Sequence, residues 1–390
     1  MRTRPGVELL CENPEKWPVK GRMGLLANPA SVDGKLRHSR DLIAEAFPGR
    51  LTALFSPQHG FFAEKQDNMV ESPDSTDPEL GIPIYSLYGK TRVPTGDMLE
   101  PVDTLIIDLQ DVGTRVYTFI YTMSYCLEAA KMHGKRVVVL DRPNPLNGVA
   151  VEGNILTPEC ASFVGRYPIP MRHGLTIGET ALLFNSRFGI GSDLSVVPME
   201  NWQRKMVFAE TGLPWVPPSP NLPTPDSAAV YPGQVIWEGT NVSEGRGTTR
   251  PFEYFGAPFI DTRGILSYLS PKFMEGIFLR PIVFEPAYHK WSGQPCHGFH
   301  IHVTRPDLYS PYATSLALLE AVIALHKDTF QWKEPPYEYE HERMPIDLIT
   351  GDREIRKRLE SLEPIESIES SWLEELDNFK TISREFHLYS

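Results

Sequence analysis

The chain has 390 residues, a length typical of two or three domains, because a single hydrophobic core rarely serves more than about 300 residues. Hydrophobic residues make up 41% of the chain and charged residues 23%, which is the composition of a globular protein in water. The formal net charge of -12 disfavours a nucleic-acid partner, whose phosphates would be repelled. No apolar run is long enough to cross a membrane and the first residues lack the apolar core of a signal peptide, so we expect a cytoplasmic protein without a membrane partner.

Five short apolar runs predict strands in the first half of the chain, at residues 22–28, 51–56, 103–109, 135–141 and 194–199. Their limited length and lack of alternation are typical of strands buried on both faces of a parallel sheet. Helical patterns lie between them, at residues 34–47, 117–134 and 176–188. This alternation predicts a Rossmann-like, doubly wound α/β domain over residues 1–204.

The second half has a different pattern. A proline-rich passage follows residue 205, then strand-like segments at 278–286 and 296–304 and a clear helix at 312–328. We expect a smaller α+β domain over residues 205–390 that closes a cleft against the first domain.

Polar side chains follow four of the predicted strands. In doubly wound sheets the ligand binds beyond the carboxyl ends of the strands, so these groups predict a polar cleft. Each one alone is compatible with a helix cap or a structural ion pair, and the prediction depends on their convergence. The candidate residues are Asn28, Gln58, His59, Glu64, Asp108, Gln110, Asp111, Arg115, Tyr117, Asp141, Arg142 and Asn144.

A second polar segment, "EGTNVSEGRGTTRPFE", occupies residues 238–253. Its glycines allow close approach of the backbone to a ligand, and its arginines are suited to binding a carboxylate. The alternatives are a surface turn with internal ion pairs, or ion pairs that hold the two domains together. The candidate binding residues are Glu238, Asn241, Glu244, Arg246 and Arg250.

Several chemistries lack their sequence motifs. There is no G-x-G-x-x-G after a strand, no phosphate-binding P-loop and no G-x-S-x-G nucleophile motif. The four cysteines form no C-x-x-C pair, which predicts reduced thiols. His300 and His302 share one face of a predicted strand, but without an accompanying carboxylate or cysteine they are more typical of half-buried strand histidines than of a metal site. We therefore expect no metal and no cofactor. The remaining carboxylates, arginines and histidines suit acid/base hydrolysis of a polar substrate such as a glycoside.

Nine motifs between residues 6 and 352 give the chain a family resemblance. They include "GLLANPASVD", "SPQHGFFAE", "DLQDVGTRVYTFIYTM", "VLDRPNPLNG", "PIPMRHGLTIGE", "GLPWVPPSPNLPT" and "YPGQVIWEGTNVSEGRGTTRPFE". In this order the motifs resemble those of the NamZ-type exo-β-N-acetylmuramidases, a glycoside hydrolase family. The resemblance implies a Rossmann-like domain joined to a smaller one, with the active site between them. It also implies cofactor-free release of terminal N-acetylmuramic acid from the non-reducing ends of peptidoglycan fragments during wall recycling.

One position departs from the family pattern. Where the family commonly has P-E-H-G, with the glutamate proposed as catalytic, this chain has Gln58 between Pro57 and His59. An amide cannot transfer a proton as a carboxyl does. The candidates for that role are then Glu64 in the same loop, His59 and His173, with Gln58 positioning substrate. The alternative is an altered relative that binds an amino sugar without cutting it. The resemblance also implies that Arg246 or Arg250 holds the lactyl carboxylate of N-acetylmuramic acid.

Overall fold

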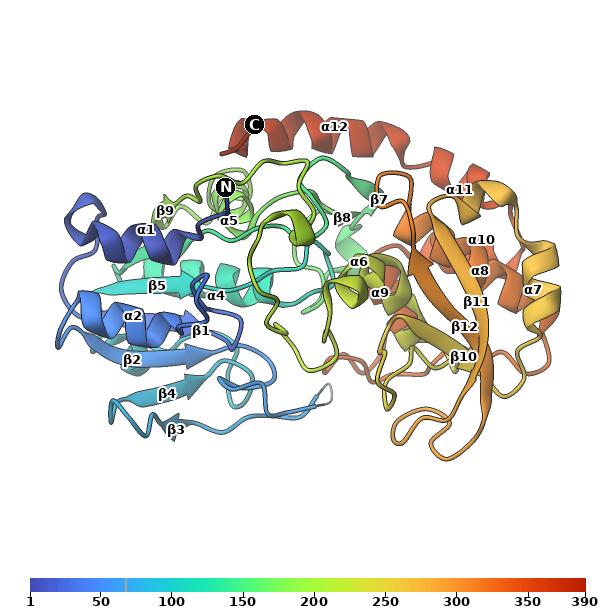
Figure 1. Ribbon diagram of the computed structural model, residues 1–390, viewed down its shortest axis with the longest axis horizontal. Helices are drawn as coiled ribbons and strands as arrows, with labels where there is room; N and C mark the ends of the chain where they lie inside the picture. Colours follow the sequence, from blue (N-terminus) through green and yellow to red (C-terminus); the bar gives the residue numbers. More distant parts are fainter. Residues whose placement is uncertain (67–68) are drawn as a thin grey trace.

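The protein is described by a computed structural model over residues 1–66 and 69–390. Its main sheet has seven strands in the order β3-β4-β2-β1-β5-β6-β9, and all neighbours pair in parallel except β3 with β4. This sheet confirms the doubly wound α/β class (Figure 1). The strands are β1 (Met23–Ala27), β2 (Leu51–Ser56), β3 (Ser75–Thr76), β4 (Pro83–Ser86), β5 (Thr104–Asp108), β6 (Arg136–Leu140) and β9 (Asp193–Val197).

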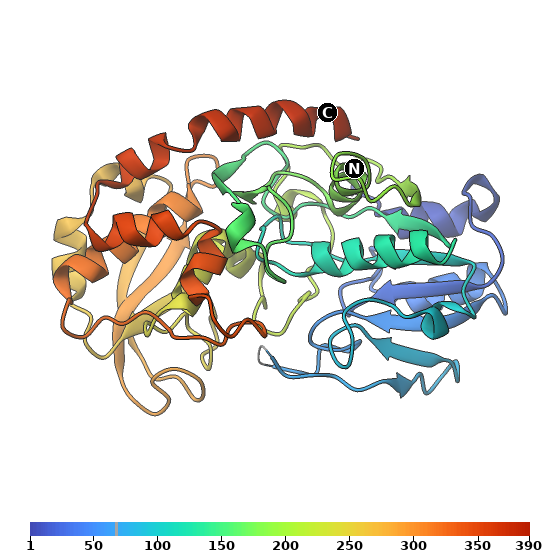
Figure 2. The same cartoon turned by 180° about the vertical axis from the view of Figure 1, so that it is seen from behind.

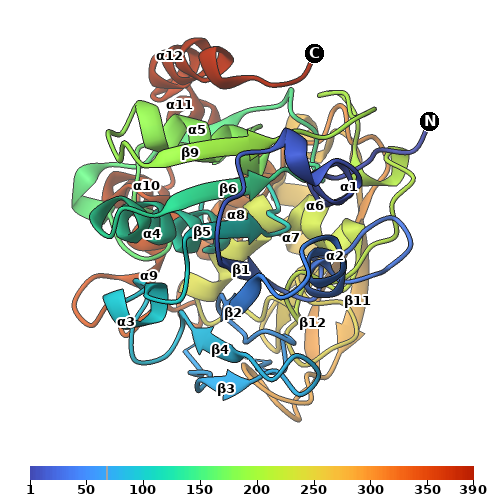
Figure 3. The same cartoon turned by 90° about the vertical axis from the view of Figure 1, so that its left-hand side faces the viewer.

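Helices cover both faces of the sheet, as Figure 3 shows. One face carries α1 (Gly6–Glu12) and α2 (Ser39–Ala46), whose apolar residues form one hydrophobic core with Met23, Leu25 and Leu54. The other face carries α4 (Phe119–Met132) and α5 (Ile177–Ser186), which pack on each other and on β6 and β9. Helix α4 lies in front of the strands in Figure 2. The short helix α3 (Gly96–Leu99) precedes β5.

The helix predicted at 34–47 begins later than expected. Leu36 has φ 65°, a left-handed conformation that a helix cannot contain, and the His38 side chain caps α2 by accepting a hydrogen bond from the Arg40 N–H. The residues before Ser39 therefore form a turn. The start of α5 fits its sequence closely, because Thr176 and Glu179 form a capping box.

The second domain is built on a three-stranded antiparallel sheet in the order β10-β12-β11. A separate hairpin, β7 (Glu152–Ile155) with β8 (Pro170–Arg172), lies between α4 and the C-terminal helices. The remaining elements are β10 (Tyr254–Ala257), β11 (Ile277–Phe284), β12 (Cys296–Val303), α6 (Pro225–Gln234), α7 (Thr262–Tyr268), α8 (Pro311–Leu325), α9 (Pro345–Thr350), α10 (Arg353–Glu360), α11 (Ile365–Ser370) and α12 (Leu373–Ser383). Short 3-10 helices are η1 (Pro14–Lys16), η2 (Pro158–Cys160), η3 (Phe208–Glu210), η4 (Val235–Gly239), η5 (Pro271–Met274) and η6 (Arg384–Phe386).

The two domains share one continuous hydrophobic core. It runs from Ile120 and Phe184 on the helices behind the sheet to Trp237 and Leu316 in the second domain. The C-terminal helix α12 lies across both domains, at the top of Figure 1, and packs on β7. This shared packing fixes the position of one domain against the other. Among the described residues no helix has the length and apolarity needed to cross a membrane.

Candidate active site

A cavity lies where the carboxyl ends of the sheet meet the second domain. From the first domain, Gln58 and His59 reach it just after β2, and residues 116–119 reach it at the start of α4. The proline-rich passage adds Ser219, Asn221 and Leu222, and the second domain closes the other side. The residues from the second domain are Tyr231, Glu238, Arg246, Phe252, Tyr337 and Glu338.

Glu338 is held in this cavity by groups from the first domain. The Tyr88 hydroxyl donates a hydrogen bond of 2.6 Å to Glu338 Oε2, and the Gln58 amide Nε2 donates one of 3.2 Å to Oε1. The Thr118 hydroxyl in turn donates to Gln58 Oε1 at 2.8 Å, which orients the Gln58 amino group toward Glu338. Burial, together with the negative charge of nearby Glu238, raises the pKa of Glu338.

The second carboxylate, Glu238, has a different environment. Arg246 Nη2 lies 2.7 Å from one of its oxygens, and the Tyr337 hydroxyl donates a hydrogen bond of 2.7 Å to the other. The guanidinium compensates the negative charge of this buried carboxyl group. The cavity therefore holds two carboxyl groups in contrasting surroundings, an arrangement that favours separate acid and base roles.

A group of charged residues outside the cavity holds Arg246 in place. Glu244 is fully buried and lies 3.2 Å from Arg246 Nε, 2.9 Å from Lys290 Nζ and 3.3 Å from His289 Nδ1. Burial alone opposes ionisation, but these three groups hold the pKa of Glu244 well below its ordinary value. Glu244 does not line the cavity, and we assign it the role of orienting Arg246 rather than of touching substrate.

Three side chains of the cavity lining come from left-handed backbone. His59 has φ 76°, Phe252 has φ 63° and Glu338 has φ 48°. Such conformations are unfavourable for residues with a side chain, and they persist where surrounding structure fixes them, often at functional sites. Here they direct these three side chains into a common space.

Two of the candidates for proton transfer do not line this cavity. Glu64 is exposed and does not line the cavity. His173 is fully buried behind the strand ends, where its Nε2 lies 3.4 Å from Asp111 and its Nδ1 accepts a hydrogen bond from the Leu175 N–H. These contacts hold His173 within the loop that precedes α5.

Other polar groups after the strands also serve the fold. Arg115 is completely buried, and it donates to the carbonyls of Asn154 and Ile169 in the first domain and of Ile349 in α9. Asp108 and Arg142 form a buried ion pair at 2.5 Å. These three residues do not line the cavity, and the structure shows their charges and hydrogen bonds paired inside the protein.

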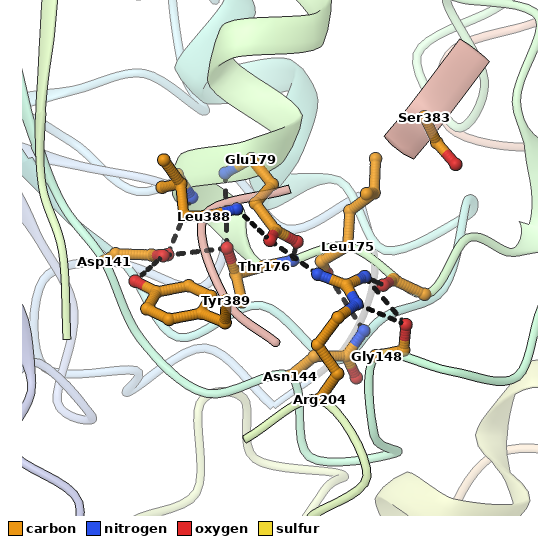
Figure 4. A network of polar contacts seen from close by, with 12 residues as sticks. Asp141, Asn144, Gly148, Leu175, Thr176, Glu179, Arg204, Ser383, Leu388 and Tyr389 are labelled. Atoms are coloured by element: carbon orange, nitrogen blue, oxygen red, sulfur yellow. Dashed lines mark hydrogen bonds and ion pairs between the residues drawn. The ribbon is translucent and has the colours of Figure 1, made fainter. Parts of the chain in front are cut away.

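Figure 4 shows a third internal network. Asp141 accepts hydrogen bonds from the Thr176 hydroxyl and the Gly178 N–H at the start of α5, both at 2.8 Å, and from the Tyr389 hydroxyl at 2.5 Å. Asn144 donates to the Leu175 carbonyl in the same network. Asp141 therefore joins the C-terminal tail to the sheet, and neither Asp141 nor Asn144 lines the cavity.

The remaining candidates divide between loop supports and the cavity. Gln110 Nε2 donates to the Pro143 carbonyl and Asn28 Nδ2 to the Pro218 carbonyl, so both hold loops. Asn241 Nδ2 donates to the Thr329 carbonyl, and Arg250 forms an ion pair with Glu253 at 3.2 Å. None of these four lines the cavity. Tyr117 does line it.

Comparison with known proteins agrees with this arrangement. The N-terminal model of "Exo-beta-N-acetylmuramidase NamZ" matches residues 23–226, and the C-terminal model matches residues 229–389. The chain belongs to the NamZ exo-β-N-acetylmuramidase family. A peptidoglycan β-N-acetylmuramidase NamZ of Bacillus subtilis (strain 168) is 43% identical over 388 residues, which span 100% of this chain and 92% of the relative.

Solved structures of relatives share the fold. A DUF1343 family protein of Bacteroides fragilis NCTC 9343 superposes with a TM-score of 0.90 at 34% identity, covering 100% of this chain and 99% of that protein. A second DUF1343 family protein of the same organism superposes with a TM-score of 0.76 at 27% identity, with the same coverage. The fold of the whole chain is thus common to these proteins.

Within this member of the NamZ family, sequence reasoning did not identify Glu338. The stretch "PPYEYEHE" reads as an ordinary polar loop, and its partner Gln58 is 280 positions away. The available signal was an acidic residue between two tyrosines after a pair of prolines, which marks a rigid turn with amphipathic side chains. Among the described residues, no group of three or more histidine, cysteine or acidic side chains is placed to hold a metal ion.

Proposed function

We propose that this chain is a glycosidase that releases N-acetylmuramic acid from the non-reducing end of peptidoglycan fragments, in the turnover of the cell wall. The full-length relative of Bacillus subtilis supports the reaction type and the glycan class. The single structural observation that carries the proposal is the pair of buried carboxyl groups, Glu238 and Glu338, on the wall of one cavity.

Glycoside hydrolysis needs a proton donor for the departing oxygen and a negative charge near the sugar carbon that becomes cationic. The cavity contains both kinds of group. Arg246 and Tyr337 both contact the Glu238 carboxyl group and fix its position on the cavity wall. Among the described residues no cation lies within ion-pair distance of the Glu338 carboxyl, so its protonated form is favoured by burial.

The cavity also offers groups for recognising an N-acetylated acidic sugar. Tyr117, Ser219 and Asn221 supply hydroxyl and amide groups for the ring substituents. Arg246 is the arginine in the cavity lining, and we propose that it attracts the lactyl carboxylate. The rings of Tyr231 and Phe252 pack edge to face, with their centroids 4.8 Å apart. They provide an apolar surface for the sugar ring.

A second candidate function rests on one observation, the amide of Gln58 in place of a carboxyl. A chain that lacked its acid would bind the same sugar without cleaving it. In that case the cavity would act as a receptor for amino sugars or muropeptides.

A pair of chromogenic β-glycosides separates the two functions. One carries N-acetylmuramic acid, and the other carries N-acetylglucosamine, which lacks the lactyl group. We expect the wild-type protein to hydrolyse the first and to act far more slowly on the second. Binding of N-acetylmuramic acid in calorimetry without release of chromophore would instead support the receptor function.

A further inference from the structure

Resting on the proposed glycosidase function, we infer that Glu338 is the catalytic acid of this enzyme and that Gln58 is a positioning residue that orients it. The loop of residues 335–340 thus supplies a carboxyl group to the cavity at the point where Gln58 carries an amide.

The hydrogen bonds around Glu338 give it one orientation. Both carboxyl oxygens accept a bond, one from Tyr88 and one from Gln58, and the Thr118 hydroxyl fixes which end of the Gln58 amide faces the acid. An amide donor at position 58 holds the carboxyl without competing for its proton. A glutamate there would place two acids within hydrogen-bond distance, and the pair would share one proton.

The backbone supports the same assignment. Glu338 and Tyr339 are adjacent residues with φ 48° and 66°, an unfavourable pair of left-handed conformations outside glycine. Tyr339 remains exposed at 38%, whereas Glu338 is buried at 6% and lines the cavity. The turn at residues 338 and 339 therefore places the Glu338 side chain in the cavity and leaves Tyr339 exposed.

The proton of Glu338 has one use in this position. As the bond between C1 of the sugar and the glycosidic oxygen breaks, its electron pair stays on the oxygen, which takes the proton of the Glu338 carboxyl. Water then supplies the hydroxyl group at C1, and its second proton restores the Glu338 carboxyl. The cycle consumes one water and leaves N-acetylmuramic acid and the free alcohol.

The leaving group distinguishes an acid from a structural residue. A sugar alcohol needs protonation to leave, whereas dinitrophenolate leaves without it. We expect Glu338→Gln to lower kcat/KM for a disaccharide with terminal N-acetylmuramic acid by about 10²- to 10⁴-fold. The kcat/KM of the same variant for the dinitrophenyl glycoside of N-acetylmuramic acid should fall far less. Glu342→Gln, on an exposed residue of the same loop, is the control and should retain both activities.

Gln58→Glu tests the inference in a protein that keeps its acid. The added carboxyl beside Glu338 should raise the pKa of the acid, so the alkaline limb of the pH profile of kcat should move to higher pH. The assignment of Glu338 would be overturned by a Glu338→Gln variant that has the native melting temperature and loses kcat/KM equally for both substrates. A variant that loses kcat/KM for neither substrate would overturn it as well. An unmoved alkaline limb in Gln58→Glu would also overturn it. Wild-type protein that cleaves neither substrate would overturn the proposed function as well.

Discussion

The amide of Gln58 and the carboxyl of Glu338 are 3.2 Å apart across the contact between the two domains, although 280 positions separate them in the chain. The two residues form the site together. Gln58 comes from the loop after β2, and Glu338 comes from the loop before α9. The site exists because the shared core fixes the two domains against each other. This relationship leads to predictions about pH, stability and catalysis.

The buried acid makes the stability of the fold depend on pH. Because the folded pKa of Glu338 is raised by burial above the unfolded value of about 4.3, its stabilising contribution is complete below pH ~4. That contribution is lost as the pH rises through the folded pKa. The free energy of unfolding of the wild type minus that of Glu338→Gln should therefore fall with rising pH. Urea unfolding of both proteins from pH 4 to 8 measures this difference, and a constant difference would contradict it.

The stability of the protein should depend on the charged residues that hold Arg246, and in particular on the charge of Lys290. Lys290 donates to Glu244 at 2.9 Å and to the carbonyls of Trp237 and Val242, all inside the second domain. Lys290→Met leaves a buried carboxylate short of a partner, and we expect a loss of about 3–5 kcal/mol in the free energy of unfolding. Chemical denaturation provides the measurement. Lys327→Met, on an exposed residue, serves as the control and should stay within about 0.5 kcal/mol of the wild type.

The C-terminal tail contributes to the stability of the first domain. The Tyr389 hydroxyl donates to Asp141 and accepts a hydrogen bond from the Met199 N–H at 2.8 Å (Figure 4 shows the first of these). Tyr389→Phe removes both bonds inside a buried network, and we expect a loss of about 1–3 kcal/mol. Tyr288→Phe, on a tyrosine that is 40% exposed, is the matched control. Equal melting temperatures of the two variants would show that the tail does not stabilise the domain.

Much of the fold follows from local patterns in the sequence. The strands at 23–27 and 104–108 are buried at every residue, and a continuous apolar run is the signature of that environment. The start of α2 was predicted too early, because the left-handed turn at Leu36 depends on tertiary contacts that periodicity does not reveal.

The site was harder to predict than the sheet. Gln58, His59, Tyr117, Glu238 and Arg246 line the cavity. The first three follow strands of the main sheet, and the other two belong to the polar segment at residues 238–253. Polar groups that tie loops together occupy the same kinds of position. Sequence position alone does not distinguish them, because the distinction depends on hydrogen-bond partners distant in the chain. Glu338 could not be identified from the sequence for the same reason, because its hydrogen-bond partner Gln58 is distant in the chain.

Mass spectrometry of a disaccharide with N-acetylmuramic acid at its non-reducing end tests the central claim most directly. Wild-type protein and Glu338→Gln are incubated with it side by side, and the released sugar is followed over time. We predict steady release of free N-acetylmuramic acid by the wild type and about 10²- to 10⁴-fold slower release by Glu338→Gln. Intact disaccharide after incubation with the wild type, or equal rates from the two proteins, would contradict the account.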